Sequence, residues 1–184
     1  MTNDEFVQEG NAATLALCAE LSASGGRLDT VRELAAAAGA AFTHDDTAAE
    51  ISKADEIIAV IAINDDGTLL CMEATLWCWE LPDREDYESK KAHRKAQGRF
   101  RELFEQQRQA AIAVFGEPDH DGTDSEERKF RYTAWRRPAA MAIVCETDHD
   151  PQFGERILVF LDFERPGAPL PLPQPLVEWL AFED

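Results

Sequence analysis

The chain has 184 residues and a formal net charge of −18 at pH 7, from 36 Asp and Glu residues against 18 Lys and Arg residues. This length suits a single domain, and a hydrophobic content of 45% excludes a disordered acidic tail. The surplus of negative charge disfavours binding to nucleic acid or to anionic lipid, because both ligands require a basic protein surface.

Two helices are predicted near the N-terminus. Residues 5–24 carry helix-forming residues with apolar positions at helical spacing, and Gly25-Gly26 interrupts the pattern. Thr30 and Glu33 have the spacing of a capping box, in which each side chain accepts a hydrogen bond from a free backbone N–H group. This spacing predicts that a second helix begins at Thr30.

A β-hairpin is the clearest local prediction. Residues 57–63 are apolar and mostly β-branched, which is typical of a central strand. Residues 64–67 (Asn-Asp-Asp-Gly) are typical of a tight turn, because Asn, Asp and Gly tolerate positive φ. The returning strand, residues 68–80, alternates so that Trp77 and Trp79 lie opposite its aliphatic face. We favour both tryptophans as core residues, and a role as interface anchors stays open.

The remaining elements follow from similar patterns. Residues 43–55 lack a strong period and are interpreted as a loop or a short helix. Residues 83–115 are predicted to form a long helix whose second half carries a buried stripe. Three further strands are predicted over residues 129–136, 140–146 and 156–164.

The chain is expected to end in a proline-rich wrap over residues 165–175 and a short helix over residues 176–181. We predict a single α+β domain over residues 1–184, of which the wrap is a part. Its sheet is expected to be mainly antiparallel, with about five strands and with the helices packed on one side. The predicted order is α-α-β-β-α-β-β-β, followed by the short C-terminal helix.

Compartment is inferred from the cysteines and from the absence of targeting patterns. The four cysteines show no metal-binding spacing, which favours reduced and mostly buried thiols (Cys18, Cys71, Cys78 and Cys145). No secretory leader is visible at the N-terminus, and no stretch approaches the ~18 apolar residues of a membrane-spanning helix. We therefore predict a cytoplasmic protein without a metal or a cofactor.

The charge is segregated along the chain. Residues 1–66 hold 13 acidic and 3 basic residues, and residues 138–184 hold 9 acidic and 2 basic residues. In contrast, 13 of the 18 basic residues lie in residues 83–137, and six of them lie in Lys90–Arg101. This basic helix either docks an anionic partner or stands in water as a solvated face. The acidic flanks carry more charge than solubility requires and would attract a protein with a basic surface.

Two Asp-His-Asp sequences are the sharpest candidates for catalysis. Residues 119–121 and 148–150 are predicted to lie in loops, where the histidine could ligate a metal or be oriented by a carboxylate. Adjacent side chains of an extended backbone point in different directions, so polar loops that form turns are the alternative. No phosphate-binding loop, nucleophile elbow or zinc-binding helix motif occurs. We therefore predict no catalytic residues.

The C-terminal half resembles a known class of protein. A helix ends at residues 115–118 (Phe-Gly-Glu-Pro), and an acidic loop leads to a strand that ends at Trp135. An apolar strand, Met141 to Cys145, is followed by a closing strand, Ile157 to Phe163. This order resembles that of the small acidic immunity proteins of bacterial polymorphic-toxin systems. The resemblance implies a non-catalytic protein that binds and blocks a cognate toxin domain, often a basic nuclease.

The sequence thus favours an acidic binding module for a basic protein partner, a toxin domain. Its candidate contact residues are acidic side chains of expected loops together with two tryptophans: Asp45, Asp46, Asp65, Asp66, Trp77, Trp79, Asp148 and Asp150. An acidic secretion chaperone for an effector is the alternative. A metal-dependent enzyme that uses the Asp-His-Asp loops is a third hypothesis.

Overall fold

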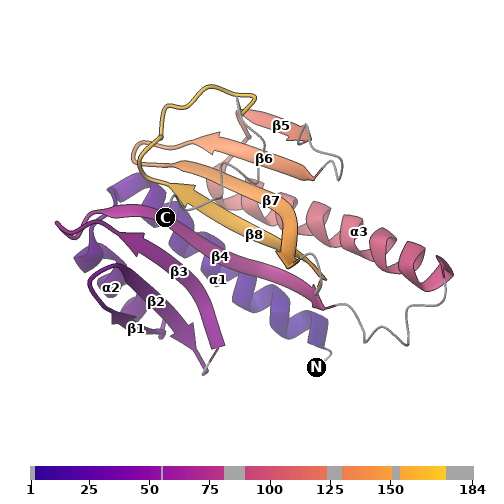
Figure 1. Cartoon of the computed structure of the whole chain (residues 1–184), viewed down its shortest axis with the longest axis horizontal. Coiled ribbons are helices and arrows are strands. Elements are labelled where there is room, and N and C mark those ends of the chain that lie inside the picture. The colour runs from indigo at the N-terminus through magenta and orange to yellow at the C-terminus, as the bar shows by residue number, and fades with distance from the viewer. Residues whose placement is uncertain (1–2, 55, 81–89, 124–129, 151–153, 173–184) are drawn as a thin grey trace.

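A computed structural model describes the backbone of residues 3–54, 56–80, 90–123, 130–150 and 154–172 (Figure 1). Side chains are described for residues 11–54, 56–77, 99–123, 130–147 and 156–172. Within these residues, no helix is both long enough and apolar enough to cross a membrane.

The described residues form three helices: α1 (Asn3–Ser24), α2 (Leu28–Ala37) and α3 (Lys90–Phe115). The helix predicted over residues 5–24 is confirmed as α1. The predicted capping box is wrong, because α2 begins two residues before Thr30 and its N-cap, Arg27, makes no capping side-chain hydrogen bond. Thr30 therefore lies inside the first turn of the helix.

The sheet has eight strands, all antiparallel, in the order β1-β2-β3-β4-β8-β7-β6-β5. The prediction of five strands, and with it the predicted element order, is wrong. Segments interpreted as loops form β1, β2 and β5. The strand bounds are β1 (Ala41–His44), β2 (Ala48–Lys53), β3 (Glu56–Ile63), β4 (Leu69–Glu80), β5 (His120–Thr123), β6 (Arg131–Arg136), β7 (Met141–Asp150) and β8 (Gly154–Asp162).

The topology divides the sheet into two similar halves (Figure 1). Helix α2 leads into the meander β1–β4, and helix α3 leads into the meander β5–β8. The last strands of the two meanders, β4 and β8, pair with each other at the centre of the sheet. No repeat is visible in the sequence, so the likeness of the halves is one of topology.

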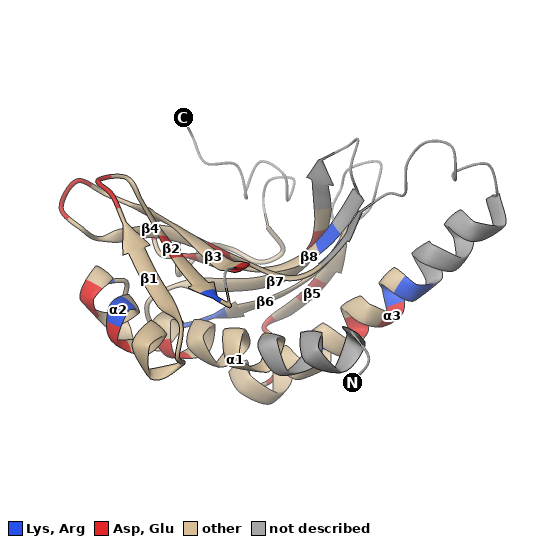
Figure 2. Cartoon of the chain, turned by 90° about the horizontal axis from the view of Figure 1, so that it is seen from below, with Lys and Arg blue, Asp and Glu red and all other residues tan. Residues whose placement is uncertain are grey.

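One face of the sheet packs against the helices and forms the main core. All three helices lie on this side (Figure 2), and each contributes buried side chains, such as Leu21 of α1, Val31 of α2 and Phe104 of α3. The inward positions of β2, such as Ile51, belong to the same core. We call the other side of the sheet the open face.

A β-bulge reorients the end of β4. The pairing of β4 with β8 shifts register between Thr75 and Trp77, so Leu76 has no partner residue on β8. The buried side chain of Asn11 donates a hydrogen bond to the Leu76 carbonyl at 2.6 Å and thereby satisfies it. Beyond the bulge, Trp77 packs against the main core, with its ring 5.6 Å from that of Phe100. The expected placement of Trp77 opposite the aliphatic face is therefore wrong.

A second core lies on the open face, over strands β6, β7 and β8, and it extends to Cys71 at the start of β4. Its buried residues include Tyr132, Ile143 and Phe160. Residues 166–172, which we call the strap, lie against it through Ala168, Leu170 and Leu172. The Leu172 amide donates a hydrogen bond to the Tyr132 hydroxyl at 3.2 Å. The rest of the predicted wrap, residues 173–175, and the predicted helix over residues 176–181 lie outside the described residues.

Candidate binding surface

Two acidic turns lie side by side at one end of the sheet (Figure 2). Asp45 and Asp46 belong to the turn between β1 and β2, and Asp65 and Asp66 belong to the turn between β3 and β4. The backbone joins the two turns, because the Ile63 amide donates a hydrogen bond to the Thr47 carbonyl at 2.9 Å. The fold thus brings four of the eight candidate contact residues together.

Two of these aspartates hold the turns in shape. An Asp45 carboxylate oxygen accepts hydrogen bonds from the amides of Thr47 at 2.8 Å and Ala48 at 2.9 Å. Asp66 accepts hydrogen bonds from the hydroxyl of Thr68 at 2.6 Å and from its amide at 3.0 Å. These hydrogen bonds favour the charged form and lower the pKa of both carboxyl groups below the usual value. Both aspartates therefore stay ionised while they define the turns.

The other two aspartates are free to meet a partner. Asp46 and Asp65 are exposed, and neither makes a hydrogen bond or an ion pair within the described part of the chain. Nothing in the described part of the chain therefore neutralises their charges.

The remaining candidates lie elsewhere. Asp148 and Asp150 belong to the far end of β7, where Asp150 is paired with Gly154 and Gly154 also pairs with Glu80. That end of the sheet is roughly 30 Å from the acidic turns, because β4 runs from one end to the other at ~3.3 Å per residue. Trp77 packs in the main core, and the side chain of Trp79 lies outside the described residues. The eight candidates therefore do not form one surface.

The open face carries a row of side chains that crosses all eight strands. Each member is the direct register partner of the next, from β1 at one edge to β5 at the other. On β6, β7 and β8 the row is buried beneath the strap, whereas on β1, β2 and β3 it is exposed. The row consists of Thr43, Glu50, Val60, Glu73, Phe160, Ile143, Ala134 and His120.

We call the exposed part of this face the uncovered half and define it by Glu50, Ile57, Val60 and Thr75. Ile57 is 56% exposed and Val60 is 39% exposed, and both are large apolar side chains. The sequence prediction missed these residues, because an apolar run over 57–63 indicates a strand buried on both faces. Within the described residues, the strap lies against the second core and leaves Ile57 and Val60 exposed.

An ion pair marks the boundary between the two halves. Arg156 of β8 bonds to the Glu73 carboxylate of β4, and both side chains are largely buried. The Arg156 Nε atom is buried and has no hydrogen-bond partner among the described residues. Glu73 is therefore neutralised within the fold, and Glu50 is the carboxylate of the uncovered half that makes no ion pair among the described residues.

His120 and Asp121 lie in β5, directly after Asp119, and residues 148–150 lie in β7, so the prediction that these sequences form loops is wrong. The three side chains of the first sequence have separate partners. Asp119 accepts a hydrogen bond from the Arg136 amide at 2.6 Å, and the His120 ring lies 5.6 Å from that of Tyr132. Asp121 binds Arg108. Each residue is thus accounted for by a structural contact.

The two histidines of these sequences are also far apart. His120 lies in the same row as Ile143, and His149 follows Ile143 by six positions along β7, roughly 20 Å at ~3.3 Å per residue. Among the described residues, no group of three or more His, Cys, Asp or Glu side chains is placed to hold a metal ion. The backbone therefore does not bring His120 and His149 together.

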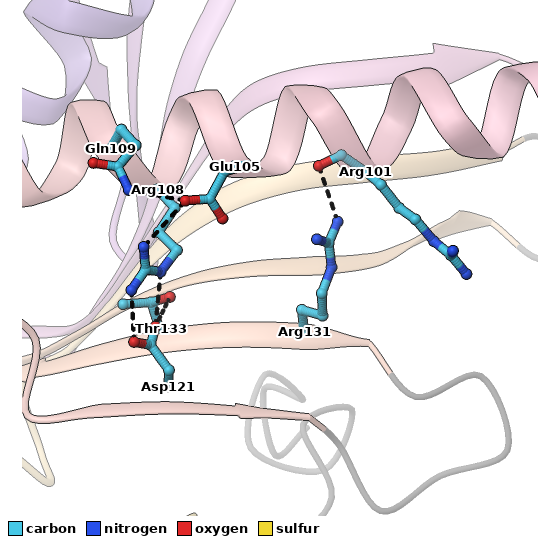
Figure 3. A network of polar contacts seen from close by, with 7 residues as sticks. All are labelled: Arg101, Glu105, Arg108, Gln109, Asp121, Arg131 and Thr133. Carbon is cyan, nitrogen blue, oxygen red and sulfur yellow. Dashed lines mark hydrogen bonds and ion pairs between the residues drawn. The ribbon is translucent and has the colours of Figure 1, made fainter.

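A polar network that the sequence prediction missed fastens α3 to the sheet (Figure 3). The Asp121 carboxylate accepts hydrogen bonds from Arg108 of α3 and, at 2.7 Å, from the Thr133 hydroxyl. Further along the helix, Arg131 donates a hydrogen bond to the Arg101 carbonyl at 3.3 Å. Arg131 also pairs with the buried Glu146, which holds its guanidinium over the main core. Arg108 and Arg131 therefore have a structural role, because they join α3 to the sheet.

The described cysteines are buried. Cys18 and Cys71 are free thiols, and Cys145 lies buried in β7. Burial raises the pKa of the Cys18 and Cys71 thiols to about 12, because a thiolate would lose its hydration. Cys18 and Cys71 are therefore expected to stay protonated at neutral pH.

Comparisons with known proteins add no information about this surface. No family model matches the sequence, and neither curated proteins nor solved structures contain a significant match.

Proposed function

We propose that this protein is a non-catalytic binding module that captures a basic protein partner, in the manner of the immunity proteins that its C-terminal half resembles. The observation that carries the proposal is the pair of adjacent acidic turns. Asp46 and Asp65 present two carboxylates without internal counter-ions, and Asp45 and Asp66 keep the turns in shape. On this proposal, the partner is a basic toxin domain.

The net charge supports the same function. A protein with a net charge of −18 attracts a basic partner over distances of about a Debye length, ~8–10 Å at physiological salt. Such attraction mainly raises the association rate and becomes weaker as salt is added. We also propose a cytoplasmic location, which the free and buried thiols support.

Coexpression with the product of the neighbouring gene tests the proposal. We expect a complex that copurifies at low salt, and we expect the complex to block the toxic activity of the partner. No complex at low salt would contradict the proposal. A symmetric dimer that binds an unfolded effector segment would replace it with the secretion-chaperone alternative.

A pair of charge-matched double variants tests the role of the turns. Asp46→Asn with Asp65→Asn removes two charges from the acidic turns, and Glu20→Gln with Glu33→Gln removes two exposed charges from the helices α1 and α2. We expect the first variant to bind the partner about tenfold more weakly, which corresponds to ~1.4 kcal/mol. The helix variant reports the effect of net charge, and an equal loss in both variants would exclude a specific role for the turns.

A further inference from the structure

The uncovered half of the open face carries exposed apolar side chains as well as a carboxylate. We propose that it seats a basic segment of the partner that also carries apolar side chains. This inference rests on the proposed function and assigns the surface through which that function is exercised.

The strap shows that a chain segment with spaced apolar side chains fits the open face. On the second half of the sheet, Leu170 and Leu172 of the strap lie over the apolar side chains of β6, β7 and β8. The first half has the same meander topology, and it leaves Ile57 and Val60 in solvent. When a partner covers large apolar side chains that are exposed on a sheet face, the free energy of the complex falls, because apolar surface is removed from water.

Charge complementarity determines the chemistry of the occupant. Glu50 lies beside Val60 as its direct register partner, so a carboxylate and an apolar side chain are immediate neighbours on this face. Asp46 and Asp65 add two further carboxylates at the end of the same strands. Lysine or arginine side chains neutralise these groups, whereas an acidic or purely apolar segment does not.

The neutralisation of Glu73 limits where the segment lies. Glu73 is already paired with Arg156 at the boundary between the halves. Glu50, Asp46 and Asp65, the carboxylates named above, lie on the β1–β3 side of that ion pair or in the turn that follows β3. The basic segment is thus expected over β2 and β3, between the boundary and the edge of the sheet.

Binding of two synthetic peptides tests the inference. One peptide alternates lysine with valine, and the other alternates lysine with serine at the same length and charge. We expect the lysine–valine peptide to bind at least about tenfold more tightly, because only its side chains cover Ile57 and Val60. Amide shifts in NMR spectra are expected at Glu50, Val60 and Thr75, with residues of α2 unaffected.

Val60→Arg and Val114→Arg provide a matched pair of variants. Val114 lies on α3 and is 37% exposed, against 39% for Val60, so both variants add one positive charge at equal exposure. We expect Val60→Arg to weaken binding of the lysine–valine peptide about tenfold and Val114→Arg to change it little. Glu50→Lys should behave like Val60→Arg, with Glu33→Lys on α2 as its control.

The outcomes separate the two proposals. If both peptides bind equally and shift only the acidic turns, this inference is wrong and the proposed function stands. Equal losses in Val60→Arg and Val114→Arg also contradict it. If neither peptide binds at low salt, the protein is no receptor for basic segments, and the proposed function fails as well.

Discussion

The Asp121 carboxylate on β5 accepts two hydrogen bonds from the Arg108 guanidinium on α3, at 2.8 Å from Nε and 2.6 Å from Nη2. The strand that carries Asp121 has four residues and forms one edge of the sheet. A strand of this length is marginal without tertiary support. The bidentate pair therefore holds the edge strand of the second meander to the helix that precedes it.

Asp121→Asn should destabilise the protein. The variant keeps the size of the side chain but removes the charge that Arg108 binds, and we expect a loss of about 1 kcal/mol, reduced because the pair is partly exposed. Urea unfolding at pH 7 measures the change in the free energy of unfolding. Asp46→Asn is the control, because that side chain makes no described contact.

The effect of Asp121→Asn should depend on pH. The hydrogen bond from Arg108 lowers the pKa of Asp121 in the folded protein below its usual value near 3.8. The carboxylate therefore contributes stability above that value, and the contribution is lost as the pH falls through the folded-state pKa. The difference between wild type and variant should stay constant from about pH 7 to pH 5 and shrink below about pH 4. A difference that does not shrink would contradict this assignment.

Gly122→Ala should be destabilising, because its position has no space for a side chain. A Cβ atom there would lie 2.7 Å from His120 Nε2 and 2.7 Å from the Tyr132 ring. The two rings must separate, at a cost of about 1–3 kcal/mol. Gly167→Ala is the control, since nothing lies within 4 Å of its Cβ position. Thermal unfolding of the two variants measures the difference, and equal melting temperatures would exclude the clash.

Trp77→Ala should lower stability rather than affinity. Trp77 packs on Phe100 in the main core, and we expect its removal to cost about 2–3 kcal/mol for a partly buried side chain. Trp77→Phe keeps the aromatic contact and should cost less. Chemical unfolding and partner binding are measured together. A folded Trp77→Ala variant of full stability that fails to bind would restore Trp77 as an interface anchor.

Asp45→Ala and Asp46→Ala should differ although the residues are neighbours. Asp45 accepts hydrogen bonds from the amides of Thr47 and Ala48, and Asp46 accepts none within the described chain. We expect a lower melting temperature only for Asp45→Ala, because only that variant leaves turn amides without their acceptor. Equal melting temperatures would show that the turn holds its shape without the carboxylate.

Sequence patterns predicted those elements whose structure is determined by the residues of the element itself. The hairpin turn at residues 64–67 is confirmed, since the Asn64 amide donates a hydrogen bond to the Thr68 carbonyl at 2.8 Å and Gly67 has a φ of 76°. The stripe of α3 is confirmed at Phe100 and Phe104, although Val114 is exposed. In both cases, turn chemistry or a helical period is sufficient.

The missed elements depend on contacts between distant residues. Strand β5 is a His-Asp-Gly-Thr segment without strand-forming character, and it is held through Arg108 and Tyr132. Strand β2 buries only Ala49 and Ile51, too few residues to establish a period. The bulge at Leu76 is stabilised by Asn11, 65 positions earlier, and it reverses the side on which Trp77 lies. None of these causes is visible within a short window of sequence.

The sequence predicted only part of the candidate binding surface, because the rest depends on contacts between distant residues. The aspartates of the two turns were identified from charge, and the topology places the turns next to each other. Glu50, Ile57 and Val60 were missed, because their exposure depends on the tertiary arrangement of the sheet and not on the local pattern of residues 57–63.

The strap also has a consequence for stoichiometry. A sheet built from two similar meanders has two topologically equivalent places for a ligand on its open face. One of them is filled by Ala168, Leu170 and Leu172 of the chain itself, which acts there as a tethered ligand at high effective concentration. The protein should therefore bind its partner one to one, and the equivalent place on the second meander should open only if the strap is displaced.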